Sequence, residues 1–354
     1  MKTAMFLGQC AINFLYFADL KQIKTFAVLQ LFRTNQILAS VLGFFFAFIW
    51  HSSVYIHVPV WEPSQSGILM NEISHLIGHS GIGARITVLL LLAIQVALGN
   101  QIVNKYRLAD ASTVFPGLFI ILLSCYSPYF LFLSTFHFIN TLLILILYIL
   151  LGTYNQPKAA DHIFNVGLLA GISFLFFPPA IYLNLFIFIA LSILRTYSIK
   201  ERIMVICGFV IPPFLAGVYY YWQNSFDLFY KLQFIHIFNK PTYLVTPYEY
   251  INLLLYFVFI CLVIFLVFSY NKIAYRRIIQ SRKRINIMYW ILGITFVTLF
   301  ILPKQGKDVY LLLSLPLGLL TSLGFISMRP KLAEIFHFVL ILGLLVSHYV
   351  GLFL

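Results

Sequence analysis

The stretch YINLLLYFVFICLVIFLVFS at residues 250–269 carries no charge, and YNKIAYRRIIQSRKRI at residues 270–285 follows it with six lysines and arginines. The next stretch, NIMYWILGITFVTLFIL at residues 286–302, is again uncharged. A transmembrane helix needs about 20 mostly apolar residues. These residues therefore predict two membrane spans joined by a basic turn, and the positive-inside rule places that turn in the cytoplasm.

The same alternation extends along the chain, in which 62% of the residues are hydrophobic and 9% are charged. The fold class that we expect is all-α, a polytopic α-helical membrane protein with about 11 transmembrane helices and no soluble domain. Residues 36–354 form a single transmembrane domain, and residues 1–35 precede it as a cytoplasmic or interfacial segment. The predicted spans are Gln36–Val58, Ala84–Val103, Thr113–Leu133, Phe136–Gly152, Ile163–Phe177, Pro179–Leu194, Arg202–Trp222, Tyr250–Ser269, Asn286–Leu302, Asp308–Ser327 and Ala333–Leu352.

The charges give these spans an orientation. With the amino terminus inside, the inner segments hold 18 of the 23 basic residues and five acidic residues, and the outer segments hold five of each. This asymmetry predicts a multi-pass protein of the bacterial inner (plasma) membrane with a cytoplasmic amino terminus. The basic residues assigned to the inner side are Lys2, Lys21, Lys24, Arg33, Lys105, Arg107, Lys158, Arg195, Lys200, Arg202, Lys272, Arg276, Arg277, Arg282, Lys283, Arg284, Arg329 and Lys331.

Several function classes are disfavoured by composition. A basic inner face is explained by anionic lipid headgroups, so the charge does not call for a nucleic-acid partner. The four cysteines lie in apolar segments at spacings that indicate neither a disulfide framework nor a metal cluster. The segment Ala4–Ala18 is short for a span; if it does cross the membrane, the amino terminus moves outside and the other spans keep their places.

Two outer loops are long enough to carry chemistry, residues 59–83 and residues 223–249. The short outer turn Pro303–Asp308 adds charged residues at the membrane edge. We expect function, if it is chemical, to lie where these three segments meet.

The first outer loop carries Glu62 and Glu72, which are candidate general bases for an acceptor hydroxyl. Residues 68–77 have the apolar spacing of a helix lying in the membrane interface. His75 and His79 stand four residues apart, a spacing at which two imidazoles on one helix can share a divalent metal ion, although the glutamate of the zinc-protease pattern is absent. A solvated acidic loop with interfacial histidines that bind no metal is the structural alternative.

The positive-inside rule disfavours lysine and arginine on the outer side, so cations in that position suggest that a ligand requires them. Lys304 and Lys307 in the outer turn, with Arg85 at the outer start of the second span, are candidates for binding the phosphate of a lipid. The alternative is that Lys307 pairs with Asp308 and that both residues only stabilise the turn.

Two stretches, NVGLLAGISFL at residues 165–175 followed by FPP at 177–179, and KQGKDVYLLLSLP at residues 304–316, resemble segments of polyprenyl-phosphate-dependent membrane glycosyltransferases of the GT-C class. The chain as a whole resembles an uncharacterised family of bacterial polytopic inner-membrane proteins. The resemblance implies a GT-C-like layout in which Glu62 is the base by position and Lys304 and Lys307 hold the lipid-linked phosphate. That class usually carries an aspartate in the first outer loop, where this chain has only the two glutamates.

Three functions follow as hypotheses. The first is a glycosyltransferase-like protein that moves a sugar from a polyprenyl-phosphate carrier to an acceptor on the outer face of the inner membrane. The second is a non-catalytic membrane scaffold or assembly subunit with envelope protein partners, and the third is a lipid-linked sugar flippase. The expected partners are membrane lipid and, for the first and third, a polyprenyl-phosphate-linked sugar.

Overall fold

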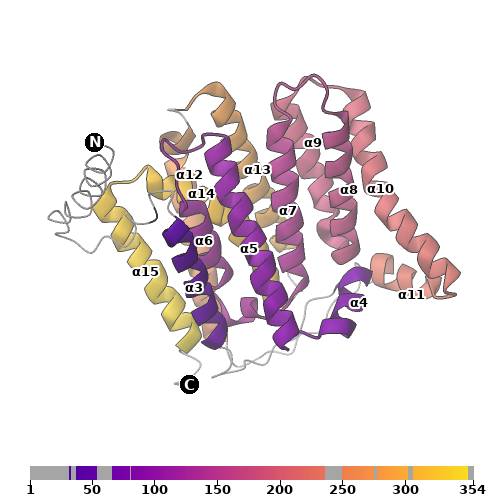
Figure 1. Ribbon diagram of the computed structural model, residues 1–354, viewed down its shortest axis with the longest axis horizontal. Helices are drawn as coiled ribbons and strands as arrows, with labels where there is room; N and C mark the ends of the chain where they lie inside the picture. The colour runs from indigo at the N-terminus through magenta and orange to yellow at the C-terminus, as the bar shows by residue number, and fades with distance from the viewer. Residues whose placement is uncertain are drawn as a thin grey trace, which may run out of the picture.

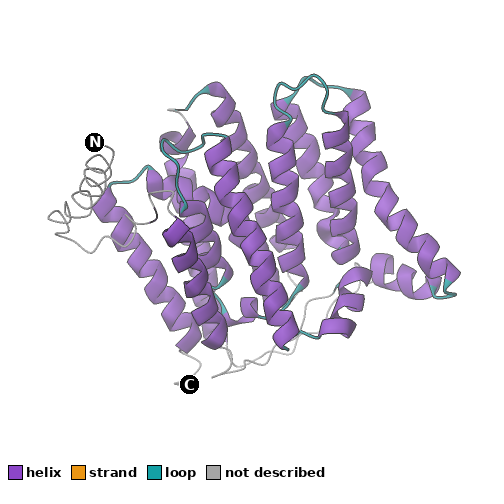
Figure 2. Cartoon of the chain, in the orientation of Figure 1, coloured by secondary structure: helices purple, strands orange, loops and turns teal. Residues whose placement is uncertain are grey.

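The computed structural model describes residues 32, 37–53, 66–79, 81–235, 249–274, 277–301 and 306–349, and within them all regular structure is helical (Figures 1 and 2). The all-α prediction is confirmed for these residues. The α-helices are α3 (Ile37–Ser53), α4 (Ile68–Ile77), α5 (Ile82–Lys105), α6 (Phe115–Ser124), α7 (Thr135–Gly152), α8 (Ala160–Phe176), α9 (Tyr182–Leu194), α10 (Ile199–Trp222), α11 (Phe226–Tyr230), α12 (Glu249–Ala274), α13 (Ile279–Ile301), α14 (Ser314–Ile326) and α15 (Pro330–Tyr349). The short elements are the 3-10 helices η2 (Pro128–Leu131), η3 (Pro178–Ile181) and η5 (Lys307–Leu313) and the π-helical turn η4 (Lys231–Ile235).

Several helices are compatible with a multi-pass membrane protein. Within the described residues, six helical segments are long and apolar enough to cross a bilayer, and further apolar helices are shorter. Their outward faces are apolar, since Phe214 on α10, Phe268 on α12 and Phe338 on α15 are all well exposed. Exposed apolar faces of this extent are typical of contact with lipid. The count of eleven spans stays a prediction.

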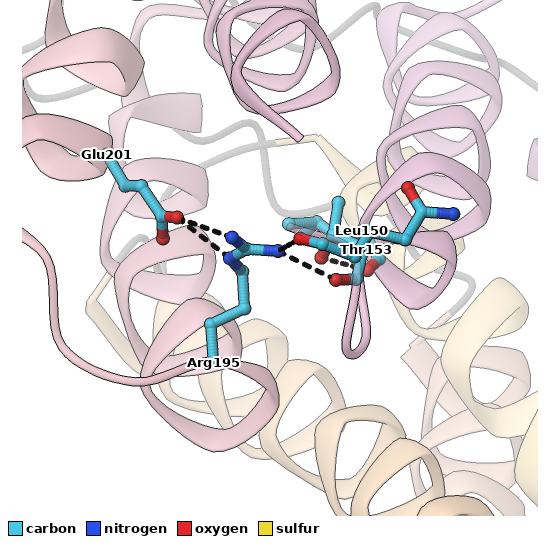
Figure 3. A network of polar contacts seen from close by, with 5 residues as sticks. Leu150, Thr153, Arg195 and Glu201 are labelled. Carbon is cyan, nitrogen blue, oxygen red and sulfur yellow. Dashed lines mark hydrogen bonds and ion pairs between the residues drawn. The ribbon is translucent and has the colours of Figure 1, made fainter. Parts of the chain in front are cut away.

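The bundle has two ends in Figure 1. The helices α4 and α11 lie at the lower end, here called the outer end, because the charge pattern assigns their loops to the outer side. The connections α7–α8 and α9–α10 lie at the opposite, inner end. There Arg195 donates hydrogen bonds to the carbonyls of Thr153 (2.9 Å) and Gln156 (2.6 Å) and forms an ion pair with Glu201 (2.8 Å; Figure 3).

A second ion pair joins two other turns that the charge pattern assigns to the inner side. Arg277, after α12, donates to Asp110 between α5 and α6, with one nitrogen–oxygen distance of 2.9 Å. Connections assigned to one side by charge alone therefore meet in pairs in the folded bundle. Which side of the membrane this end faces stays a prediction.

The third predicted span is not a continuous helix. The prediction of a helix over Thr113–Leu133 is wrong beyond Ser124, where α6 ends after ten fully buried residues. Residues 125–134 then run as irregular backbone with the short η2, since Pro128 lacks the N–H that would continue the helix. Irregular backbone at membrane depth is tolerated where protein covers it, and most of this connection is buried.

The fifth and sixth predicted spans form two separate helices, α8 and α9, with η3 between them. Glycines let α8 approach α10 closely. A methyl group added at Gly167 would lie 2.3 Å from the carbonyl oxygen of Val205, and one added at Gly171 would lie 2.4 Å from that of Phe209. The two glycines are four residues apart, the small-residue spacing that membrane helices use for close crossings. The NVGLLAGISFL stretch thus has a packing role.

Candidate functional site

The first outer loop forms the predicted helix, α4, at residues 68–77. Gly67, just before the helix, donates its N–H to the carbonyl of Phe176 at the end of α8 (2.7 Å). A methyl group at Gly67 would lie 2.2 Å from the carbonyl oxygen of Leu175, so this close approach requires glycine. The start of α4 is therefore fixed against the outer end of α8.

The second outer loop reaches the same place through Gln233, a fully buried side chain of η4. Its amide nitrogen donates to the carbonyl of Phe174, and its Oε1 accepts from the N–H of Ile68 at 3.4 Å. One side chain thus bonds the end of α8 and the start of α4. The expectation that the outer segments meet is correct for the described parts of these two loops. Sequence reasoning missed Gln233, because a single glutamine in a loop carries no signal of burial.

Glu72 is exposed on α4, and its carboxylate is held from one side. The hydroxyl of Tyr220, near the end of α10, donates to Oε1 of Glu72 at 2.9 Å. Tyr220 is itself buried and stacks on Phe229 of α11, with ring centroids 5.9 Å apart. The carboxylate therefore has a defined position at the surface of the outer end. Tyr220 lies 148 residues away in sequence, so no local pattern connects the two residues.

The two histidines of the first loop do not share a helix face. His75 lies in the last turn of α4, but the helix ends at Ile77 and Gly78 has a φ of +74°, which turns the chain before His79. The predicted helical arrangement is therefore wrong, because glycine in a positive-φ conformation ends the helix two residues before His79. Among the described residues, no group of three or more His, Cys, Asp or Glu side chains is arranged to hold a metal ion.

His79 instead contacts the irregular connection between α6 and α7. Its Nδ1 lies 3.1 Å from the carbonyl oxygen of Leu133, and its own carbonyl accepts from the N–H of Leu133 at 3.2 Å. Lys307, at the start of η5, reaches the same connection: its Nζ lies 3.3 Å from the hydroxyl of Tyr129 and 4.7 Å from the centroid of that ring. This connection therefore contacts both the end of the first outer loop and the start of η5.

The remaining predicted cation, Arg85, lies in the first turn of α5 and is half-buried. The helix α5 packs against α3. Glu72 thus contacts α10, Lys307 contacts η2, and Arg85 lies in the first turn of α5. The predicted site residues Glu62 and Lys304 and the segment Ala4–Ala18 lie outside the described residues.

Uncharged polar side chains within the predicted spans hold the broken helices together. Asn140 of α7 donates to the carbonyl of Leu311 (2.8 Å) and to the hydroxyl of Ser314 (3.2 Å), and Ser124 donates to Ser314 (3.2 Å). Leu311 and Ser314 lie where η5 passes into α14, and Ser124 ends α6. These bonds satisfy backbone and side-chain groups that hydrocarbon would leave unpaired.

No protein-family model, curated protein or solved structure matches this chain. The function is therefore argued from the chemistry of the site.

Proposed function

We propose that this protein is a membrane glycosyltransferase, which transfers a sugar from a polyprenyl-phosphate carrier to an acceptor on the outer face of the bacterial inner membrane. The observation that carries the proposal is the Glu72 carboxylate. It is exposed at the outer end, it sits on a short helix fixed against α8, and the hydroxyl of Tyr220 orients it at 2.9 Å. A fixed, accessible carboxylate at a membrane interface suits a general base for an acceptor hydroxyl.

The reaction needs a cation for its leaving group. The acceptor oxygen attacks the anomeric carbon, the bond from that carbon to the phosphate oxygen breaks, and the acceptor proton passes to the carboxylate. The polyprenyl phosphate leaves with the bonding electrons as an anion. Lys307 and Arg85 are the described cations proposed to hold it, together with Lys304, and charge-assisted hydrogen bonds of this kind are the stronger ones. Glu62 is the second candidate base.

The aromatic residues at the end of α10 support a reaction at the level of the lipid headgroups. Tyr219, Tyr221 and Trp222 are exposed close to the outer end of the helix, and Figure 1 shows this part of α10 extending away from the bundle beside α11. Tyrosine and tryptophan concentrate where hydrocarbon meets headgroups. Tyr220 and its partner Glu72 would then lie at the level of a lipid phosphate.

The test is sugar transfer by the purified protein in lipid nanodiscs. The donors are a panel of polyprenyl-phosphate-linked hexoses and pentoses with radiolabelled sugars, and the acceptor is a bacterial envelope extract. We expect Glu72→Gln, alone or with Glu62→Gln, to reduce transfer at least 100-fold, a size typical of general bases. The matched control is Glu334→Gln, which removes a carboxylate at the start of α15, on the predicted inner side. Full transfer by the double glutamine variant would overturn the proposal.

The scaffold function is favoured by one observation, the wide apolar face of α10, where Ile203, Val210 and Phe214 are all exposed. A partner helix fits such a face as well as lipid does. Wild-type protein that binds no donor but co-purifies with a stable envelope partner would support the scaffold. Donor binding and movement between leaflets without transfer would support a flippase.

A further inference from the structure

Three cations from distant segments share the faces of two tyrosine rings at the inner end of the bundle. The ring centroid of Tyr106, just after α5, lies 5.4 Å from Nζ of Lys105 and 4.2 Å from the guanidinium carbon of Arg284. The ring centroid of Tyr154, after α7, lies 5.7 Å from the same guanidinium carbon and 5.4 Å from Nζ of Lys283. Lys283 and Arg284 lie near the start of α13. The three cations are here called the inner cation cluster.

Hydrogen bonds hold the elements of this cluster together. Ser281, near the start of α13, donates its hydroxyl to the carbonyls of Tyr106 and Arg107 at 3.4 Å each. The hydroxyl of Tyr106 donates to the carbonyl of Tyr148 near the end of α7 at 3.1 Å. Nζ of Lys105 donates to the hydroxyl of Tyr148 at 3.0 Å. The start of α13 and the ends of α5 and α7 are therefore joined where the cations lie.

Arg284 is a buried charge with neutral partners. It is 6% exposed, and in the described part of the chain it forms no ion pair. Its Nε donates to the carbonyl of Leu151 at 3.2 Å. Gln280, with its amide oxygen facing Arg284, accepts from Nη1 (3.2 Å) and Nη2 (2.9 Å). Buried charges in proteins are normally paired with an opposite charge, so this arrangement lacks an anion.

The lysines of the inner cation cluster add to the excess of positive charge. The two ion pairs described above at the inner end join other residues, and among the described residues neither Lys105 nor Lys283 belongs to one. Like charges gathered around two shared rings repel one another. An anion bound beside them would therefore stabilise the cluster.

The surroundings of the cluster favour a lipid over a free ion. Ile278 and Ile279 are 79% and 72% exposed, and Ile279 lies four residues before Lys283, on the same face of α13. Lys105 is also exposed, so the cluster is open at its edge. Exposed apolar side chains beside cations suit the boundary between acyl chains and headgroups.

We propose that Lys105 and Lys283, supported by the buried charge of Arg284, bind the phosphate of an anionic phospholipid headgroup, with Ile278 and Ile279 against its acyl chains. Lys105 gives one hydrogen bond to Tyr148, and an ammonium group has further N–H donors for the phosphate oxygens. Basic pockets between membrane helices on the cytoplasmic side bind such headgroups. The site lies at the end of the bundle opposite Glu72, so the inference does not depend on sugar transfer.

The test titrates the full-length protein in maltoside micelles with short-chain phosphatidylglycerol, phosphatidylcholine of the same chain length, and inorganic phosphate. Native mass spectrometry gives the apparent dissociation constant of the first bound lipid, and calorimetry measures inorganic phosphate. We expect the wild-type protein to bind phosphatidylglycerol about tenfold more tightly than phosphatidylcholine, and the Lys105→Gln/Lys283→Gln variant to lose this preference. The matched control is Lys158→Gln/Lys200→Gln, which removes the same charge from exposed positions on the predicted inner side and should keep the preference.

Three results would overturn the proposal. The first is equal binding of the two lipids by the wild-type protein, which is measurable even if a variant does not fold. The second is a control variant that loses the preference as completely as Lys105→Gln/Lys283→Gln, since general attraction to the inner surface would then explain it. The third is inorganic phosphate that binds as tightly as phosphatidylglycerol, because the site would then bind the free ion.

Discussion

Replacing Gly167 by alanine should destabilise the bundle, because this glycine sits where α8 crosses α10. The added methyl group would lie 2.3 Å from the carbonyl oxygen of Val205, whereas ordinary contact begins at 3.4 Å. The neighbour is backbone and cannot rotate away, so the two helices must separate by about 1 Å, and overpacking of this kind costs about 1–3 kcal/mol. Better helix propensity returns up to roughly 1 kcal/mol. With the full gain subtracted, we expect a net loss of about 0–2 kcal/mol in the free energy of unfolding, which is about 1–3 kcal/mol relative to a glycine-to-alanine change that meets no neighbour.

The assay is reversible unfolding in mixed micelles with increasing SDS, followed by circular dichroism. Gly293→Ala in α13 is the matched control, because a methyl group there meets nothing within 4 Å. It should leave stability unchanged or raise it by up to about 1 kcal/mol. If Gly167→Ala unfolds at the same SDS fraction as Gly293→Ala, α8 and α10 do not approach as closely as described here.

Three other predictions concern the site, the sidedness and the response to pH. Tyr220→Phe removes the hydrogen bond to the exposed Glu72, so it should lower the free energy of unfolding by less than about 1 kcal/mol. It should slow sugar transfer about tenfold, since the carboxylate loses its orientation. Unchanged transfer would show that Tyr220 does not position the base. A cysteine replacing the exposed Leu76 should react with a membrane-impermeant maleimide on intact spheroplasts, whereas one replacing the exposed Gln156 should react only after lysis; the opposite pattern would invert the orientation. Burial raises the pKa of Tyr106, with Lys105 and Arg284 opposing the shift, so the unfolded chain loses this proton first. The contribution of Tyr106 to stability is complete below the usual tyrosine pKa of about 10 and declines above it. The melting temperature of Tyr106→Phe should therefore fall less steeply above about pH 10 than that of the wild-type protein. Parallel melting curves against pH would contradict this.

The broken span shows where sequence reasoning reached its limit for the fold. Hydropathy over residues 113–133 predicted one helix, since most residues there are apolar and none is charged. Pro128 was the available signal that the helix ends early. What no local pattern could supply is the reason that the break is tolerated: the hydroxyl of Ser314 and the amide of Asn140 meet α6 and η5 from helices far away in the chain.

The candidate site also has parts that the sequence could predict and parts that it could not. Glu72, Lys307 and Arg85 were recognisable in the sequence because each places a charge beside a predicted span. Their partners were not recognisable, because Tyr129 and Tyr220 are two of 22 tyrosines with no distinguishing spacing.

The amino-acid sequence by itself determined that this is an all-helical chain with the composition of a membrane protein, which loops share an end of the bundle, and where the short helix of the first outer loop lies. These properties are local, because hydropathy and charge act residue by residue against the bilayer. Only the tertiary structure decided that α6 stops halfway, that Gln233 joins two loops, and that Gly78 separates His75 from His79. Those outcomes depend on packing between distant segments, which the order of residues along the chain does not display.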